Sequence, residues 1–364
     1  MNRFSFYNIF SCLVLPIICF SNPESDKRGI PLDTSPLEVR MGFTLSNITD
    51  VNEREETIDF DGALFLSWKD DRLAYEPTTV GYTSEYKLGD HSQVPRLIYQ
   101  GDFSVKEIFN GWRPHIILQN GIGDRVKTNI SLGIWPDGTV VYGEAFSAKA
   151  ETPMDLRRFP FDRQKLEIFF QVFLYKRDQL VLKPDDNLAS TWNQNIGIAQ
   201  WDNEGFLFSE RTIEMATLSG RKTLKSELVA SINIKRQPMH FLFSTILPLV
   251  VLVCLSWTVF WLDDETVSNR INISFIGILS VVAYYFVIQN NIPNISYLTL
   301  IDAFIIMTFI FLAASVIVSL VVDKLNRAGK SKIGDKIDYV SRWIFPSSYL
   351  LITILLVGLF FIFT

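Results

Sequence analysis

The chain has 364 residues, a formal net charge of −5 and 48% hydrophobic residues. This length allows two domains, and the mild charge lacks the clustered basic face of a nucleic-acid-binding protein. The cysteines Cys12, Cys19 and Cys254 all lie in apolar stretches, so no disulfide framework is expected in the polar part of the chain. The three histidines have no partners at metal-ligand spacing, and no set of nucleophile, base and acid stands out. We therefore expect no metal, no cofactor and no enzyme activity.

The N-terminal stretch, residues 1–21, has the pattern of a secretory signal peptide. Arg3 precedes an apolar run, and Cys19 and Ser21 supply small residues for cleavage. The pattern predicts cleavage near Ser21, and an uncleaved signal anchor is the alternative.

Residues 22–238 alternate apolar and polar side chains in short runs separated by Gly, Asp, Asn and Pro. The clearest runs cover residues 37–49, 57–68, 138–148, 164–175 and 227–236. Such period-two segments predict an all-β extracellular sandwich of about ten antiparallel strands. The polar segment 184–205 is expected to be a long surface loop.

Residues 239–364 contain four apolar runs, at about 241–262, 271–289, 300–322 and 343–364. The first has no charged residue, and about 20 apolar residues are enough to cross the hydrocarbon core. Trp257, Trp261 and Trp343 lie near the ends of these runs, as interfacial tryptophans do. This part is predicted to form an all-α bundle of four transmembrane helices in contact with membrane lipid.

The loops between the spans predict the orientation. The link at 323–342 holds six Lys or Arg residues, whereas the link between the second and third spans holds none. Because positively charged loops stay in the cytoplasm, the first link is predicted to be cytoplasmic and the β domain to lie outside.

The second span differs from the others because polar residues interrupt it. Every third or fourth residue from its start forms one stripe: Asn272, Ile276, Leu279, Ala283, Phe286 and Asn290. A pore lined by this stripe would have polar mouths and an apolar waist. A second stripe is equally helical: Ser274, Gly277, Val281 and Tyr284. Periodicity alone does not decide which stripe faces water and which packs against other helices.

Four segments together carry a family resemblance: 66–77 (LSWKDDRLAYEP), 111–120 (GWRPHIILQN), 134–146 (IWPDGTVVYGEAF) and 152–166 (TPMDLRRFPFDRQKL). They resemble the pentameric ligand-gated ion channels, or Cys-loop receptors. Thr152 and Leu166 stand where animal members have the loop cysteines. This is the pattern of the prokaryotic branch, which includes a bacterial amine-gated channel that the chain resembles. We call residues 152–166 the signature loop.

The resemblance implies a homopentamer of identical subunits around a central pore for inorganic ions, in the cell (inner) membrane with the β domain periplasmic or extracellular. It places Arg270 at the cytoplasmic start of the second helix and Pro293 in its outer loop, which selects the stripe from Asn272 to Asn290 as pore-lining. The gate is then expected at Leu279 and Phe286.

The inner mouth of such a pore would carry Glu265, Asn269 and Asn272. Rings of carboxylates favour cations, so the acidic run 263–265 favours a cation channel if it faces the axis. An anion-selective channel of the same family remains the alternative.

The resemblance also implies a set of residues that couple the two domains: Phe159, Pro160, Asp162, Arg236 and Pro293. Asp162 and Arg236 are expected to form a buried ion pair. A solvated surface pair is the alternative.

The family's agonist site aligns with Ala63, Ile117, Gln171, Phe173 and Met215. Amine-binding members surround a cation with aromatic rings, but only Phe173 is aromatic here, and the alternative for Phe173 is a core ring. The agonist is therefore left open between another small molecule, protons and a ligand that binds elsewhere. A membrane-tethered solute sensor is the competing function, although a tether would need one span rather than four.

Overall fold

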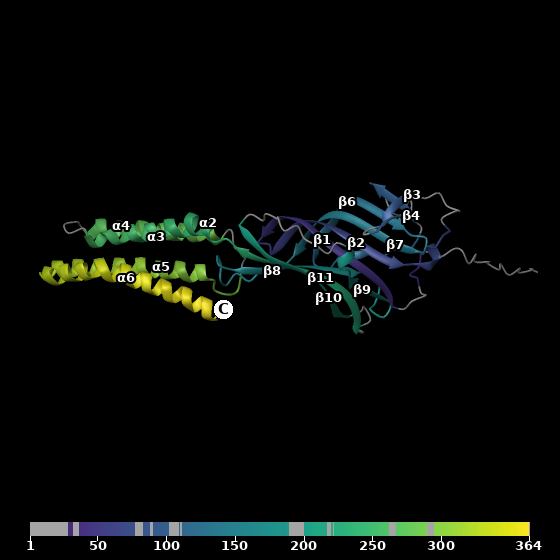
Figure 1. The fold of residues 1–364 in the computed structure, drawn as a ribbon. Coiled ribbons are helices and arrows are strands. Elements are labelled where there is room, and N and C mark those ends of the chain that lie inside the picture. Colours follow the sequence, from purple (N-terminus) through teal and green to yellow (C-terminus); the bar gives the residue numbers. More distant parts are fainter. Residues whose placement is uncertain are drawn as a thin grey trace, which may run out of the picture.

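The computed structural model describes residues 28–31, 36–76, 83–87, 90–101, 109, 111–188, 200–216, 220, 222–261, 267–289 and 295–363. The strands form one elongated part of the chain and the helices form the other (Figure 1). The expected signal peptide, residues 1–21, lies outside the described residues.

The β domain is a sandwich of two sheets. The first has the strand order β3-β4-β6-β7-β2-β1-β9, and the second has the order β10-β11-β8-β5. The strands of the sandwich are β1 (Leu37–Asn52), β2 (Thr57–Lys69), β3 (Thr83–Lys87), β4 (Asp90–Gly101), β5 (Ile116–Leu118), β6 (Gly121–Ile134), β7 (Thr139–Glu151), β8 (Arg163–Val172), β9 (Leu180–Pro184), β10 (Trp201–Ala216) and β11 (Lys222–Arg236).

The alternating runs of the sequence form these strands because every second side chain points between the sheets. In β2, for example, buried and half-buried residues alternate along almost the whole strand. Phe43, Phe60, Phe146 and Phe170 meet in the centre of the core, and Phe43 and Phe170 have ring centroids 4.8 Å apart. The expected all-β sandwich is confirmed.

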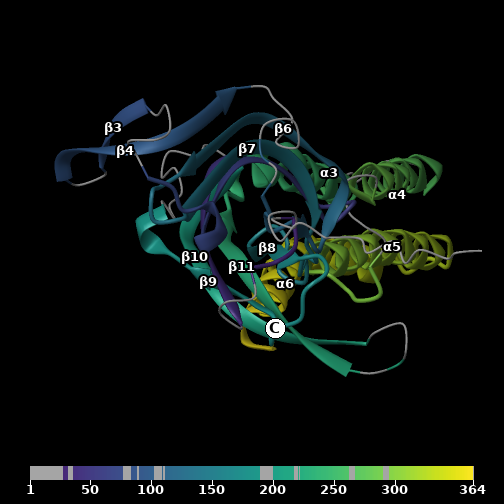
Figure 2. The same ribbon diagram turned by 90° about the vertical axis from the view of Figure 1, so that its right-hand side faces the viewer.

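Two details differ from the expectation. The edge pair β1 and β9 is parallel, because β9 returns to the sheet after a crossover from the second sheet. The expected loop 184–205 ends earlier, since β10 begins at Trp201 and pairs in register with Arg236. The hairpin of β10 and β11 extends beyond the rest of the sandwich (Figure 2).

The helical part begins directly after β11. Its elements are α2 (Met239–Phe241), a π-helical turn (Leu242–Ile246), α3 (Leu247–Trp257), a 3₁₀ turn (Thr258–Trp261), α4 (Val267–Gln289), α5 (Leu300–Arg327) and α6 (Ser331–Phe363). Four helical stretches are long and apolar enough to cross a membrane: Met239–Trp261, Asn269–Gln289, Leu300–Arg327 and Ser331–Ile362.

The polar stretch 323–342, expected as a linker, is mostly helical, because α5 continues to Arg327 and α6 begins at Ser331. Thr299 caps α5: its hydroxyl accepts a hydrogen bond from the Asp302 N–H, and the Asp302 carboxylate accepts one from the Thr299 N–H. Helix α6 runs back to the β domain, so the C-terminal end lies near the junction of the two parts (Figure 1).

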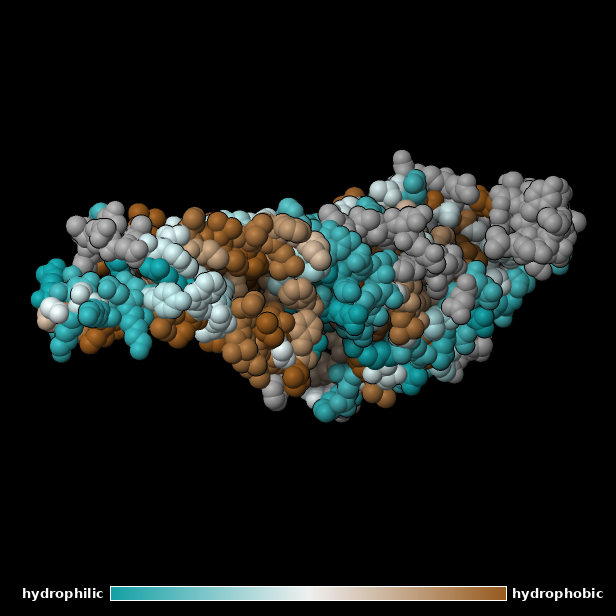
Figure 3. All heavy atoms as spheres, turned by 60° about the vertical axis from the view of Figure 1, so that its left-hand side comes forward, coloured by the Kyte–Doolittle hydropathy of each residue, from teal (hydrophilic) through white to brown (hydrophobic). Residues whose placement is uncertain are grey.

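Hydrophobic side chains gather on the helical part between its hydrophilic far end and the β domain, on the face shown in Figure 3. Helix α6 has the smallest buried share of the four spans, 11%, and its exposed residues include Leu351, Ile354 and Leu355. An apolar surface of this extent needs lipid or other subunits around it. The helical part therefore belongs in a membrane.

Candidate functional site

One face of α4 is exposed in the isolated chain. Its members recur every three or four positions: Asn269, Asn272, Ile276, Leu279, Ala283 and Phe286. The three large apolar residues are among the most exposed in the helical part, with exposed fractions of 63% for Ile276, 66% for Leu279 and 61% for Phe286. This is the stripe expected to line a pore; Asn290, Glu265 and Pro293 lie outside the described residues.

The competing stripe of α4 packs inside the subunit. Ser274 and Val281 are fully buried, and Gly277 is buried between them. A side chain at Gly277 would collide with the Ser256 hydroxyl of α3, so the glycine permits close contact between the two helices. Tyr284 packs partly against the same helical core. This face therefore serves helix packing, and the first stripe is left for contacts outside the subunit.

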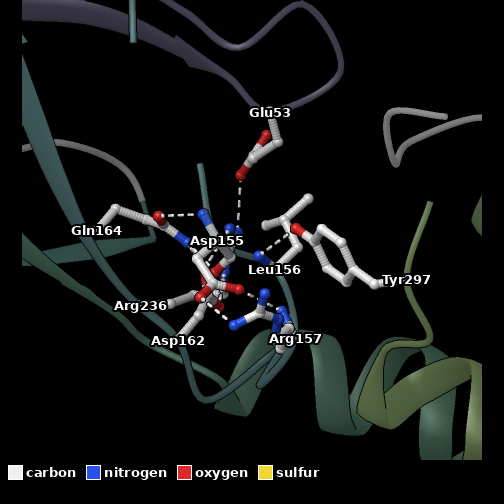
Figure 4. A network of polar contacts seen from close by, with 8 residues as sticks. All are labelled: Glu53, Asp155, Leu156, Arg157, Asp162, Gln164, Arg236 and Tyr297. Atoms are coloured by element: carbon white, nitrogen blue, oxygen red, sulfur yellow. Dashed lines mark hydrogen bonds and ion pairs between the residues drawn. The ribbon is translucent and has the colours of Figure 1, made fainter. Parts of the chain in front are cut away.

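The signature loop joins the β domain to the helices. The Leu156 N–H donates a hydrogen bond to the Tyr297 hydroxyl at 3.1 Å, and the Leu300 N–H donates to the Arg157 carbonyl at 2.9 Å. Leu156 and Phe159 belong to the hydrophobic cluster of the helical part although they lie in the β domain sequence. Figure 4 shows Tyr297 reaching the loop from the helical side. The loop is thus packed into the helical bundle.

Phe159 and Pro160 form the tip of this loop. The peptide bond between them is cis, and both residues are buried. The Phe159 ring lies edge-on to Phe241 of α2, with centroids 4.8 Å apart. The β domain therefore contacts the helices through aromatic rings as well as through hydrogen bonds.

The expected ion pair between Asp162 and Arg236 is present and buried. Arg236 Nε lies 2.8 Å from Asp162 Oδ1, and the two residues are 4% and 2% exposed. A second carboxylate, Glu53 from the turn after β1, lies 2.7 Å from Arg236 Nη1. The guanidinium also covers the rings of Trp201, at 4.0 Å, and Phe159, at 4.7 Å. The burial excludes the alternative of a solvated surface pair.

Gln164 holds the other side of this network (Figure 4). Its amide nitrogen donates to Asp162 Oδ2 at 2.6 Å and to the Asp155 carbonyl, and its amide oxygen accepts from the Asp155 N–H. One side chain therefore fixes both ends of the loop that carries Phe159. Sequence reasoning missed Gln164, because a glutamine does not signal a buried partner without the fold. Glu53 lies in the turn at 51–55, which the family resemblance implies takes part in coupling, but its pairing with Arg236 was not foreseen.

The residues aligned with the agonist site lie at one end of the second sheet. Ile117 on β5 is the register partner of Gln171 on β8, and the Gln171 amide lies 3.5 Å from the Met215 sulfur. Gln171 is buried, whereas Phe173 is 53% exposed and lies edge-on to His115. Phe173 is therefore not a core ring. Ala63 lies apart from them, on β2 of the first sheet.

Two buried carboxylates near these residues were not foreseen. Glu227, the register partner of Gln171, pairs with Arg211 at 2.5 Å. Glu144 on β7 pairs with Arg125 at 2.5 Å and with Lys127 at 2.8 Å. Glu144 shares the inward face of β7 with Val140, Tyr142 and Phe146, and an acidic residue at such a position is the sequence signal that could have found it. Glu227 lies on the face of β11 opposite the core residues Leu228 and Ala230, where the alternation gives no such signal.

The charged residues around Glu144 and His115 shift the pKa values of these two side chains. Burial raises the pKa of Glu144, but the charge of Arg125 and the contact with Lys127 outweigh burial and hold that pKa below its usual value. For His115, burial and then the charges of Arg113, Lys127 and Arg125 lower the pKa below 6.5. Among the described residues, no group of His, Cys, Asp and Glu is arranged to hold a metal ion.

Comparison with known families decides the class of the protein. Residues 21–238 match the neurotransmitter-gated ion-channel ligand binding domain, and residues 245–334 match the neurotransmitter-gated ion-channel transmembrane region. The first match alone covers more than half of the chain. The chain belongs to the neurotransmitter-gated ion-channel family. It is a subunit of a ligand-gated, multi-pass membrane channel and not an enzyme.

Individual relatives agree with this assignment. A proton-gated ion channel of Gloeobacter violaceus is 29% identical over 331 residues, which are 91% of this chain and 85% of the relative. A gamma-aminobutyric acid receptor subunit beta of Lymnaea stagnalis is 24% identical over 290 residues, 78% of this chain and 55% of the relative. The human gamma-aminobutyric acid receptor subunit rho-1 is 26% identical over 297 residues, and the chain spans 56% of its length.

Proposed function

We propose that five copies of this chain form a homopentameric channel whose pore is lined by the exposed stripe of α4. The observation that carries the proposal is the division of α4 into two faces: one packs against α3 through Gly277, and the other, centred on Leu279, is exposed in the part of the chain that the structure describes. Symmetric assembly would bring five copies of the exposed face together around an axis.

Leu279 and Phe286 are proposed as the gate. Between Asn272 and Phe286 the exposed stripe is apolar, and an apolar constriction closes a pore when water leaves it. Leu279→Ala should lower the wetting barrier and give current without agonist in planar bilayers that contain the purified protein.

The matched control for the gate is Leu355→Ala. Leu355 is an equally large residue, 56% exposed, but it lies on α6. It should leave the closed channel silent. If Leu279→Ala and Leu355→Ala both stay silent under every ligand and pH step, the pore proposal fails and a membrane-tethered sensor becomes the better reading.

The agonist is proposed to be an extracellular small molecule or a change in proton concentration, acting near Ile117, Gln171, Phe173 and Met215. The single exposed ring at Phe173 and the cations around His115 do not form the aromatic cage that an amine prefers. The relative from Gloeobacter violaceus, whose name states proton gating, supports including protons. A screen of pH steps, carboxylates and amines, read as current, tests this assignment.

Coupling between agonist site and gate is proposed to pass through Phe159, Pro160, Asp162, Arg236 and Pro293. The support is the contact of the signature loop with Tyr297 and Phe241 on the helical side of the junction. Variants of these residues should change the agonist dependence of the current more than the conductance of the open pore.

Cations are proposed as the conducted ions, with Glu265, Asn269 and Asn272 at the inner mouth; an anion-selective pore is the alternative. The support is the acidic run 263–265 beside the start of α4. The reversal potential in asymmetric salt distinguishes the two. The channel is proposed to lie in the inner membrane, with the β domain outside after removal of the signal peptide; the charges in 323–342 support this orientation.

A further inference from the structure

We propose that Asp338 of α6 is a selectivity-determining residue, because it holds the Arg270 guanidinium inside the subunit and away from the inner mouth of the pore. The inference rests on the proposed pore along α4. It concerns a contact between the start of the pore helix and the helix that faces lipid.

The two side chains form a buried ion pair. Arg270 Nη1 lies 2.8 Å from Asp338 Oδ2, and each residue is 6% exposed. Asp338 Oδ1 is buried without a hydrogen-bond partner among the described residues, so the contact with Arg270 through Oδ2 is what compensates the buried charge of the carboxylate. Such a pair is costly to break from one side only, because it leaves the other charge buried and uncompensated.

The position of Arg270 makes a negative partner necessary. Arg270 lies in the first turn of α4, where the helix dipole is positive and disfavours a cation. Along a helix each residue turns by about 100°, so Arg270 points away from the face that carries Asn269 and Asn272. At the start of α4 the exposed face therefore presents the amides of Asn269 and Asn272, whereas the Arg270 guanidinium points into the helical bundle.

A second contact fixes the same part of α6. Arg342, one turn after Asp338, donates from Nε to the Phe260 carbonyl at 2.7 Å. The residues between and after them on this face, Ser341 and Phe345, are buried. Helix α6 is thus held against both α4 and the end of the first span, and Asp338 keeps a defined position relative to Arg270.

Removing the charge of Asp338 should release five guanidinium groups toward water at the inner mouth. A ring of positive charge there repels cations and attracts anions. Five charges at the inner mouth, partly screened by salt, should change the ratio of cation to anion permeability by about tenfold. The direction of the change is the same whichever ion the wild-type channel prefers.

The test is the reversal potential of Asp338→Asn in a steep NaCl gradient, measured in planar bilayers in the Leu279→Ala background so that no agonist is needed. The potential should move toward the chloride equilibrium potential. The matched control is Asp335→Asn, which removes the same charge from an exposed site one turn earlier on α6 and should leave the potential unchanged. The double variant Arg270→Gln/Asp338→Asn should return to the parent value.

The inference is overturned if D338N and D335N have the same reversal potential. It is also overturned if the double variant keeps the reversal potential of D338N. Asp338→Ser supplies a second neutral variant if D338N does not assemble. If every variant conducts with an unchanged reversal potential, only this inference fails. If every variant is silent, including the Leu279→Ala parent, the proposed channel itself fails.

Discussion

The ion pair of Asp162 and Arg236 allows a quantitative prediction for Asp162→Asn. The change leaves the Arg236 guanidinium buried, with Glu53 at 2.7 Å as its remaining acidic partner in this network. Breaking a buried pair from one side costs about 3–5 kcal/mol, and because Glu53 remains we expect the lower end, about 3 kcal/mol. At about 2–4 °C per kcal/mol, the apparent Tm should fall by about 6–12 °C.

The assay is thermal unfolding of the purified protein in detergent, followed by tryptophan fluorescence. Glu38→Gln is the control, because Glu38 pairs with Arg40 at 3.0 Å but both side chains are half exposed. Such a pair contributes about 0–1 kcal/mol. If Asp162→Asn lowers the Tm no more than Glu38→Gln does, the buried network does not stabilise the junction and the argument from burial is wrong.

Two further predictions concern the β domain and the junction. Because the pKa of His115 lies below its ordinary 6.5, the unfolded chain takes up the proton first as the pH falls. The folded protein should therefore lose stability between pH 6.5 and the lowered pKa of the folded state, and His115→Gln should remove that part of the pH dependence of the Tm. Tyr297→Phe removes the hydroxyl that accepts from the buried Leu156 N–H, which should cost about 1–3 kcal/mol in unfolding free energy. A Tm that is unchanged in Tyr297→Phe would show that water satisfies this N–H instead.

Much of the fold could be predicted from the sequence because its signals are local. Alternation along 57–68 and 227–236 predicts strands, since side-chain direction in a strand reverses at every residue. Four long apolar runs predict spans by length alone. The parallel pairing of β1 with β9 could not be predicted, because it depends on a crossover between segments about 140 residues apart.

Some features of the candidate site could likewise be predicted from the sequence, and others depend on the tertiary structure. The sequence by itself determined that the second span is polar enough for a pore and that its residues fall into two helical stripes. The family resemblance favoured one stripe, and only the tertiary structure shows that the other stripe packs inside the subunit, because the rotation of α4 depends on Ser256 of α3 fitting against Gly277. It also decided which charges meet: Asp162 and Arg236 are 74 residues apart, and Arg270 and Asp338 are 68 apart. The pattern of hydrophobic residues is local and determines the strands and helices. The pairing of buried charges depends on how segments that are distant in the sequence pack together.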